Sequence, residues 1–155
     1  MEIRHMQEQR IKIGEGGRLI IPAAYRKEMG VQPGDELVIR IQDAEQSFLL
    51  PGDIEKKVEN ELVDEHAPLA ATFLKVRHHG SKTSSTDAFV APVAPHVAVV
   101  SVGEGNQFGH PVDSVVDRYA RAGVRFLRTD RDGAVTTLTD GHDLVVHTFV
   151  GEHPQ

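Results

Sequence analysis

A short apolar run is the feature that most constrains what this chain can fold into. Residues 97–102 read VAVVSV, with no charged side chain among them. A strand with one face in water alternates apolar and polar side chains, so a continuous run predicts a strand that is buried on both faces. Such a strand needs a layer of structure on each side of its sheet. The run therefore predicts a layered α/β fold.

The segments around this run supply elements for the layers. Residues 53–65 place Ile54, Val58 and Leu62 four positions apart, which predicts an amphipathic helix with a charged outer face. Two more helices are expected from their capping residues, over residues 84–95 and 111–123. The remaining apolar segments predict strands at residues 72–76, 124–129, 133–139 and 143–149.

The composition excludes several classes of protein. The chain has 155 residues with 39% hydrophobic side chains, which is typical of a globular protein. It has no cysteine, so disulfides and thiolate metal sites are excluded. No apolar run is long enough to span a bilayer, and the polar N-terminus does not resemble a signal peptide. We expect a cytoplasmic protein with no membrane segment in this chain.

The first third of the chain predicts a separate small module. A hairpin is expected over residues 11–21, a helix that ends at Gly30, and strands near residues 37–41 and 47–51. So few elements bury little core alone, which predicts an obligate dimer. Residues 1–30 carry six Lys and Arg against four Asp and Glu, whereas the chain as a whole has a net charge of −6. Any surface that binds nucleic acid should therefore lie near the N-terminus.

Residues 5–50 resemble the AbrB/MazE/SpoVT swapped-hairpin family, through the sequence IKIGEGGRLIIPAAYRKEMGVQPGDELVIRI at residues 11–41. The resemblance implies an interlocked dimer that binds DNA as a transcriptional regulator or as an antitoxin. By position, it assigns four cations to the DNA: Lys12, Arg18, Arg26 and Lys27. The alternative is that these cations form a solvated face, and Glu15 and Glu28 among them weaken the positive field.

A second resemblance covers residues 47–149. HHGSKTSS at residues 78–85, NQFGHP at 106–111 and RTDRDG at 128–133 follow one another as in the C-terminal half of the ComEC-type metallo-β-lactamase domain. That domain belongs to a membrane protein of DNA uptake and resembles metal-dependent nucleases. The resemblance implies half of a metallo-β-lactamase-like layered α/β domain, and it makes a metal-dependent hydrolase acting on DNA the alternative function.

The resemblance also implies metal ligands, in a set that this sequence leaves incomplete. Asp53 matches the carboxylate that bridges two metals, His79 matches the last metal histidine with His78 beside it, and His110 matches a position near the site. Zinc or manganese would suit such ligands. The family's H-x-H-x-D-H motif is missing, because the chain contains no His-x-His pair. We therefore expect no hydrolase activity from this polypeptide alone, with metal bound only if another chain completes the site. Asp53 has the alternative role of capping the helix that follows it.

Together these interpretations divide the chain into residues 1–46, a DNA-binding module, and residues 47–155, a truncated hydrolase-like portion. No Gly- or Ser-rich linker separates the two, so the join falls beside a shared strand near residues 43–47. We expect DNA as a partner and a homodimer, with a partner protein as a third hypothesis. The missing half would have covered the strands at 72–76 and 97–102, so we expect a second chain or the N-terminal hairpins to cover them.

Overall fold

The computed structural model describes residues 27, 30, 32, 39–54 and 56–150. The chain forms two compact units, residues 1–35 and 36–155. In the first unit Lys27 is helical and exposed, and Gly30 has a φ of 71° with its N–H donating to the Lys27 carbonyl at 3.3 Å. Both observations agree with a helix that ends at Gly30. The hairpin expected over residues 11–21 lies outside the described residues.

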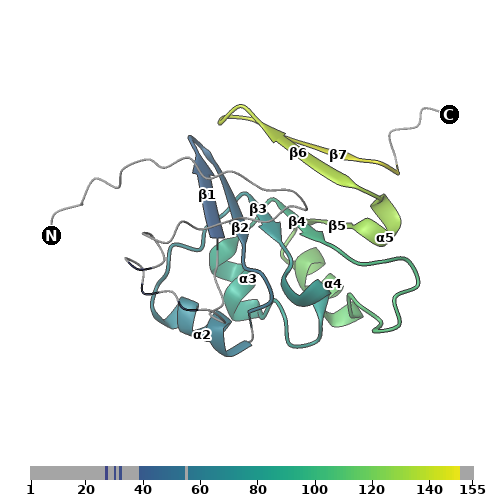
Figure 1. Cartoon of the computed structure of the whole chain (residues 1–155), viewed down its shortest axis with the longest axis horizontal. Coiled ribbons are helices and arrows are strands. Elements are labelled where there is room, and N and C mark those ends of the chain that lie inside the picture. The colour runs from purple at the N-terminus through teal and green to yellow at the C-terminus, as the bar shows by residue number, and fades with distance from the viewer. Residues whose placement is uncertain (1–26, 28–29, 31, 33–38, 55, 151–155) are drawn as a thin grey trace, which may run out of the picture. The chain divides into compact units, whose positions relative to one another are not determined.

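The second unit alternates strands with helices, which confirms the predicted layered α/β arrangement (Figure 1). Its strands are β1 (Ile39–Asp43), β2 (Gln46–Leu50), β3 (Phe73–Lys75), β4 (Val97–Val100), β5 (Arg125–Arg128), β6 (Val135–Thr139) and β7 (Leu144–Thr148). Its helices are α2 (Lys56–Asp64), α3 (Asp87–Val93), α4 (Asp113–Arg121) and the short α5 (Thr129–Asp132), and η2 (Arg77–Gly80) is a 3₁₀ turn.

Five of these strands form one sheet in the order β1-β2-β3-β4-β5, and β6 pairs with β7 as a separate hairpin. The strands β2 to β5 are parallel, and β1 lies antiparallel to β2 at the edge. Parallel pairing brings the carboxyl ends of β2, β3, β4 and β5 to the same edge of the sheet. The loops that follow these strands therefore meet there, which is where open α/β sheets bind their ligands.

The two faces of the sheet are covered differently. One face of the sheet packs on the helices, where Phe89 of α3 and Tyr119 of α4 belong to the same core cluster as the strand residues. The strand residues of this cluster include four that pair in register across β2 to β5: Leu49, Leu74, Ala98 and Phe126. On the other face Val97, Val99 and Leu127 form a smaller cluster with Val135 and Val146 of the β6–β7 hairpin. Figure 1 shows the helices and this hairpin on opposite sides of the sheet.

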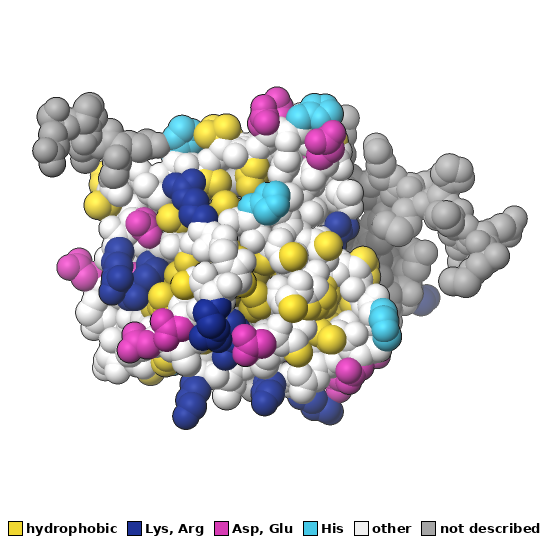
Figure 2. All heavy atoms as spheres, turned by 180° about the vertical axis from the view of Figure 1, so that it is seen from behind, with side chains coloured by type: hydrophobic (Ala, Val, Ile, Leu, Met, Phe, Trp, Pro, Cys, Tyr) yellow, Lys and Arg dark blue, Asp and Glu magenta, His cyan; other side chains and the backbone are white. Residues whose placement is uncertain are grey.

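This second cluster corrects one expectation. All four residues of β4 are buried, as the apolar run predicts, but on this face the chain's own β6–β7 hairpin supplies cover that the sequence leads us to expect from a second chain or from the N-terminal hairpins. Some apolar surface stays exposed, since Ile41 of β1 keeps 50% and Leu138 of β6 keeps 56% of its surface in solvent. On the face seen in Figure 2, hydrophobic side chains lie near the centre with charged side chains of both signs around them.

The helices follow their sequence signals, with one exception. The hydroxyl of Thr86 accepts a hydrogen bond from the Phe89 N–H at 3.2 Å, so Thr86 is the N-cap of α3, within the segment where a capping residue is expected. Val115 and Tyr119 lie four positions apart on the buried face of α4, as the apolar residues of an amphipathic helix do. The exception is Glu59 of α2, which belongs to the expected charged outer face yet has none of its surface exposed.

The strand β2 pairs with one strand that precedes it in the chain and with one that follows it. Phe48 pairs with Ile41 of β1 on one side and with Phe73 of β3 on the other. The rings of Phe48 and Phe73 lie 5.5 Å apart. The strand that we expect the two modules to share is thus hydrogen-bonded to β1 on one side and to β3 on the other. All five strands from β1 to β5 belong to one sheet. The predicted boundary at residues 46 and 47 stays a prediction.

Candidate functional site

The histidine loop, which is η2 with the residues up to Thr86, leaves the carboxyl end of β3 through an unusual backbone. His78 and His79 have φ values of 44° and 53°, and Gly80 follows with a φ of 76°. Non-glycine residues rarely adopt this left-handed region, and such conformations concentrate at binding and catalytic sites. A Cβ on Gly80 would lie 2.6 Å from the Cβ of Pro111, so this close approach requires glycine.

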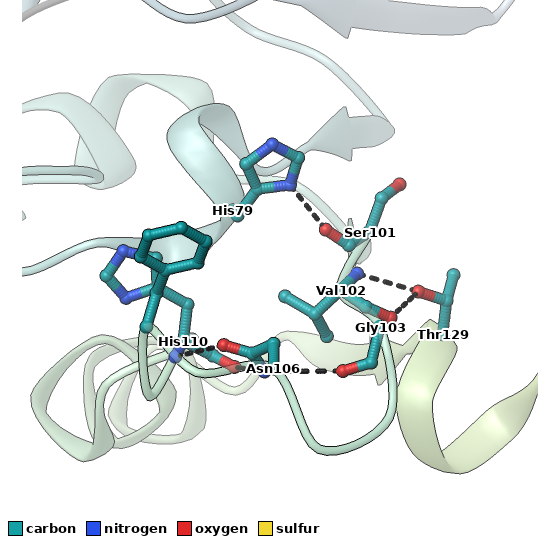
Figure 3. Close-up of a pocket in the computed structure, with 8 residues that line it drawn as sticks. His79, Ser101, Val102, Gly103, Asn106, His110 and Thr129 are labelled. Carbon is teal, nitrogen blue, oxygen red and sulfur yellow. Dashed lines mark hydrogen bonds between the residues drawn. The ribbon is translucent and has the colours of Figure 1, made fainter.

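A cavity of about 440 Å³ opens beside this loop, at the carboxyl edge of the sheet (Figure 3). Residues from η2, from the loop after β4 and from the start of α5 line this histidine cavity: His79, Ser101, Val102, Gly103, Asn106, Phe108, His110 and Thr129. Its volume falls in the range of sites that hold small molecules. The cavity therefore lies where the sheet topology predicts a ligand.

The tautomer of His79 follows from its partner. Its Nδ1 lies 2.6 Å from the carbonyl oxygen of Ser101, which accepts hydrogen bonds and cannot donate them. In the neutral ring Nδ1 therefore carries the proton, and Nε2 has the free lone pair. A backbone carbonyl bonded to one ring nitrogen is a common way to orient a histidine whose other nitrogen binds a metal or a proton.

Asn106 closes the loop that carries His110. Its amide donates to the His110 carbonyl at 2.8 Å and to the Gly103 carbonyl at 3.3 Å, and its side-chain oxygen accepts from the His110 N–H at 3.0 Å. The ring of His110 stacks on Phe108, with 6.2 Å between their centroids, and Phe108 is 74% exposed. The loop thereby presents an aromatic pair at the mouth of the cavity.

Thr129 fastens the ends of β4 and β5 together. Its hydroxyl donates to the Val102 carbonyl and accepts from the Val102 N–H, both at 2.8 Å. Next to it, Arg128 makes a two-point contact with Asp130, at 3.0 Å and 2.6 Å. That hydrogen bond from Arg128 is the main reason why the pKa of Asp130 is lowered. The RTDRDG motif thus acts in this fold as a fastening for the cavity wall.

A buried ion pair lies beneath the histidine loop. The side chains of Glu59 and Arg77 are both fully buried, and Arg77 Nε donates to Glu59 Oε1. The same carboxylate accepts from the N–H of Ser85 at 2.7 Å and of Thr86 at 3.0 Å. The hydroxyl of Tyr119 donates to Ser85 Oγ at 2.9 Å. This network, which we name the Glu59 network, attaches both ends of the histidine loop to α2 and α4.

The residues predicted as metal ligands are only partly brought together. His79 and His110 line one cavity, while His78 and Asp53 are not among its lining residues. Asp53 is exposed after β2, and its charge acts on Lys75 of β3, whose pKa is lowered by burial and raised in part by Asp53. The described residues contain no group of three or more His, Asp or Glu side chains that could hold a metal. They do not fit a complete metal centre, which takes about three protein ligands.

The predicted DNA-binding residues lie almost entirely outside the described part of the chain. Lys12, Arg18 and Arg26 are not described, and Lys27 is exposed on its helix. Residues that the sequence reasoning missed are Asn106, Thr129 and Glu59. Asn106 had a signal, since an asparagine in a Gly-rich loop is typical of side-chain bonds to nearby backbone. Glu59 had none, because it looks like its charged neighbours on α2.

The second unit is thus defined as an open, mostly parallel α/β sheet with a ligand-sized cavity at its carboxyl edge. Comparison with known proteins gives two different matches. Residues 5–46 match the family of AbrB-like transcriptional regulators. The chain is also 36% identical over 99 residues to ComE operon protein 3 of Bacillus subtilis, a match that covers 64% of this chain and 13% of that protein.

Two further relatives match other lengths of the chain. Competence protein ComA of Neisseria gonorrhoeae is 34% identical over 133 residues, which is 85% of this chain and 19% of that protein. Recombination protein 2 of Haemophilus influenzae is 39% identical over 84 residues, 54% of this chain and 10% of that protein. The chain therefore spans less than a fifth of the length of these relatives. Both resemblances drawn from the sequence, to AbrB-like proteins and to ComEC-type competence proteins, are confirmed.

Among the helices of the described residues, none combines the length and the apolar character that a membrane crossing demands.

Proposed function

We propose that this chain is a DNA-binding protein that acts as a dimer through its AbrB-like segment, joined to a ComEC-like α/β unit that lacks hydrolase activity on its own. The observation that carries the proposal is the match of residues 5–46 to AbrB-like transcriptional regulators. The excess of Lys and Arg in residues 1–30 supports it, because the rest of the chain is acidic.

The cations near the N-terminus determine how DNA binding should depend on salt. Lys12, Arg18, Arg26 and Lys27 would be present twice in a dimer, which gives enough cations for several phosphate contacts. Each contact to duplex DNA contributes about −0.9 to the slope of log K against log salt. Affinity should therefore fall steeply as salt rises, and the acidic remainder of the chain should keep it moderate.

A band-shift titration on mixed duplex DNA at two salt concentrations tests this proposal. We expect binding by the wild type and a loss of at least tenfold in Arg18→Ala/Arg26→Ala. The matched control is Arg121→Ala/Arg125→Ala, which removes two exposed arginines from the α/β unit. Equal binding by the wild type and by both variants would contradict the proposal, and a monomer by light scattering would contradict its dimer.

A second candidate is a metal-dependent hydrolase that acts on DNA. The observation that favours it is the pairing of His79 and His110 at one cavity, with Nε2 of His79 free to accept. The resemblance to ComEC-type proteins of DNA uptake supports a substrate of this class. Metal bound there would supply a Lewis acid and an activated water, but the described residues do not provide its full ligand set.

Cleavage of single-stranded DNA with added manganese or zinc separates the two candidates. Our proposal expects no cleavage and less than one metal ion per chain after dialysis. Cleavage that is lost in His79→Ala but kept in His96→Ala would favour the hydrolase, because His96 is exposed and does not line the cavity.

A further inference from the structure

A second cavity, which we name the basic cavity, is lined in part by the last residues of the histidine loop. It has a volume of about 650 Å³ and is open to solvent. Its lining comes from α2, from the loop before α3, from α3 and from α4: Lys56, Asn60, Lys82, Thr83, Ser84, Thr86, Asp87, Ala88 and Arg118. None of these residues lines the histidine cavity, so this is a separate place on the molecule.

The lining of the basic cavity carries a net positive charge, and part of that charge is not paired with a carboxylate. The charged lining residues are the cations Lys56, Lys82 and Arg118 and the carboxylate Asp87. Asp87 lies 3.1 Å from Arg118 Nε and 3.6 Å from Arg121 Nη2. Arg118 also donates to the Ser85 carbonyl at 2.8 Å. Lys56 and Lys82 are exposed and form no ion pair with any residue that the structure describes. The free positive charge of the cavity is therefore that of two lysines.

Neutral donors lie beside these charges. The hydroxyls of Ser84 and Thr86 are engaged, because Ser84 donates to the Ser81 carbonyl and Thr86 caps α3. The amide of Asn60 and the hydroxyl of Thr83 remain available to a ligand. Among the described residues, the Thr83 hydroxyl has only a long contact of 3.5 Å with Ser81 Oγ. Lysine ammonium groups together with amide and hydroxyl donors are the usual contacts of phosphate oxygens.

The loop that lines the basic cavity is anchored to the fold by hydrogen bonds to Glu59. Glu59, directly before Asn60 on α2, binds the N–H groups of Ser85 and Thr86 and the side chain of Arg77. The loop that carries Lys82 and Thr83 is therefore anchored at both ends by one buried carboxylate. An anchored loop loses little conformational entropy when it binds a ligand, which favours affinity.

From this geometry we infer that the basic cavity binds a phosphate group of a nucleic-acid strand. A free phosphate would leave most of a 650 Å³ cavity empty, whereas a strand can fill it with its sugars. A strand could also continue toward the histidine cavity, because Lys82 comes three positions after His79 and the chain spans at most about 11 Å over that distance. The inference does not depend on the N-terminal module.

Amide chemical shifts of the full-length chain provide the test, with the signals of Thr83 and Ser84 as local reporters. The probes are a twelve-residue oligothymidylate and, separately, inorganic phosphate. We expect the oligonucleotide to shift both reporters at a lower concentration than phosphate does. In Lys56→Ala/Lys82→Ala the dissociation constant at these reporters should rise at least tenfold, and the salt slope should fall by about 1.4, or about 0.7 for each lost contact.

The matched control is Lys57→Ala/Arg125→Ala, which removes the same charge from positions outside the basic cavity. Lys57 is next to Lys56 on α2, but its ammonium lies 3.5 Å from Glu61. The control should bind as the wild type does. Unmoved reporters, equal loss in both double variants, or equal affinity for inorganic phosphate would each overturn the inference. Reporter shifts that persist in Arg18→Ala/Arg26→Ala would support a site independent of the N-terminal module.

Discussion

Arg77 and His79 are two residues apart in the histidine loop, yet they lie in opposite environments. Arg77 is 1% exposed and bonds to Glu59, whereas His79 is exposed at an open cavity. The left-handed turn at His78 and His79 separates the two sides of the loop. One side of the loop therefore stabilises the fold while the other side is free to bind, so neighbouring residues of one motif need not share one role.

The largest expected effect is on the buried side. Glu59→Gln leaves Arg77 buried without its counter-charge, so we expect the free energy of unfolding to fall by about 3–5 kcal/mol. The control Glu61→Gln removes an exposed charge on the same helix and should change it by less than about 0.5 kcal/mol. Denaturant titration measures both, and similar losses in the two variants would show that the Glu59 network is not what holds the loop.

The turn between the two sides is tested by a pair of glycines. Gly80→Ala combines a left-handed φ with a Cβ only 2.6 Å from Pro111, so we expect a loss of about 3 kcal/mol. Gly105 has a similar φ of 63° but nothing within 4 Å, so Gly105→Ala should cost only about 1 kcal/mol. Thermal unfolding compares the two, and equal costs would mean that the contact with Pro111 does not constrain the loop.

The smallest expected effect is at the far end of the Glu59 network. Tyr119→Phe removes the hydrogen bond to Ser85 and should cost about 1 kcal/mol near pH 7. Burial raises the pKa of the Tyr119 hydroxyl, so the folded protein resists its ionisation. The stability that this gives is complete below the unfolded pKa of about 10 and is lost as the pH rises above it.

Urea titrations between pH 9 and pH 11 would measure that loss. We expect the free energy of unfolding of the wild type to fall more steeply with pH than that of Tyr119→Phe. Parallel curves for the two proteins would contradict the assignment of this pH dependence to Tyr119.

Most elements of the α/β unit could be predicted, because their signals are local. The apolar run of β4, the cap at Thr86 and the buried stripe of α4 depend on nearest neighbours in the sequence. The candidate site was predicted only in part. His79 and His110 do meet at one cavity, but Asp53 lies beside Lys75, since the direction of an exposed side chain after a strand has no signature in the sequence.

The sequence by itself determined the layered fold, the two resemblances and the absence of a His-x-His motif, because these depend on residue types and spacing along the chain. Only the tertiary structure decided that Glu59 is buried, that β6 and β7 cover the second face of the sheet, and that Lys56 and Lys82 border one cavity. The reason is physical. Burial and charge pairing depend on which distant elements pack together, and a charged residue on a helix carries no local mark of the partner that it will meet.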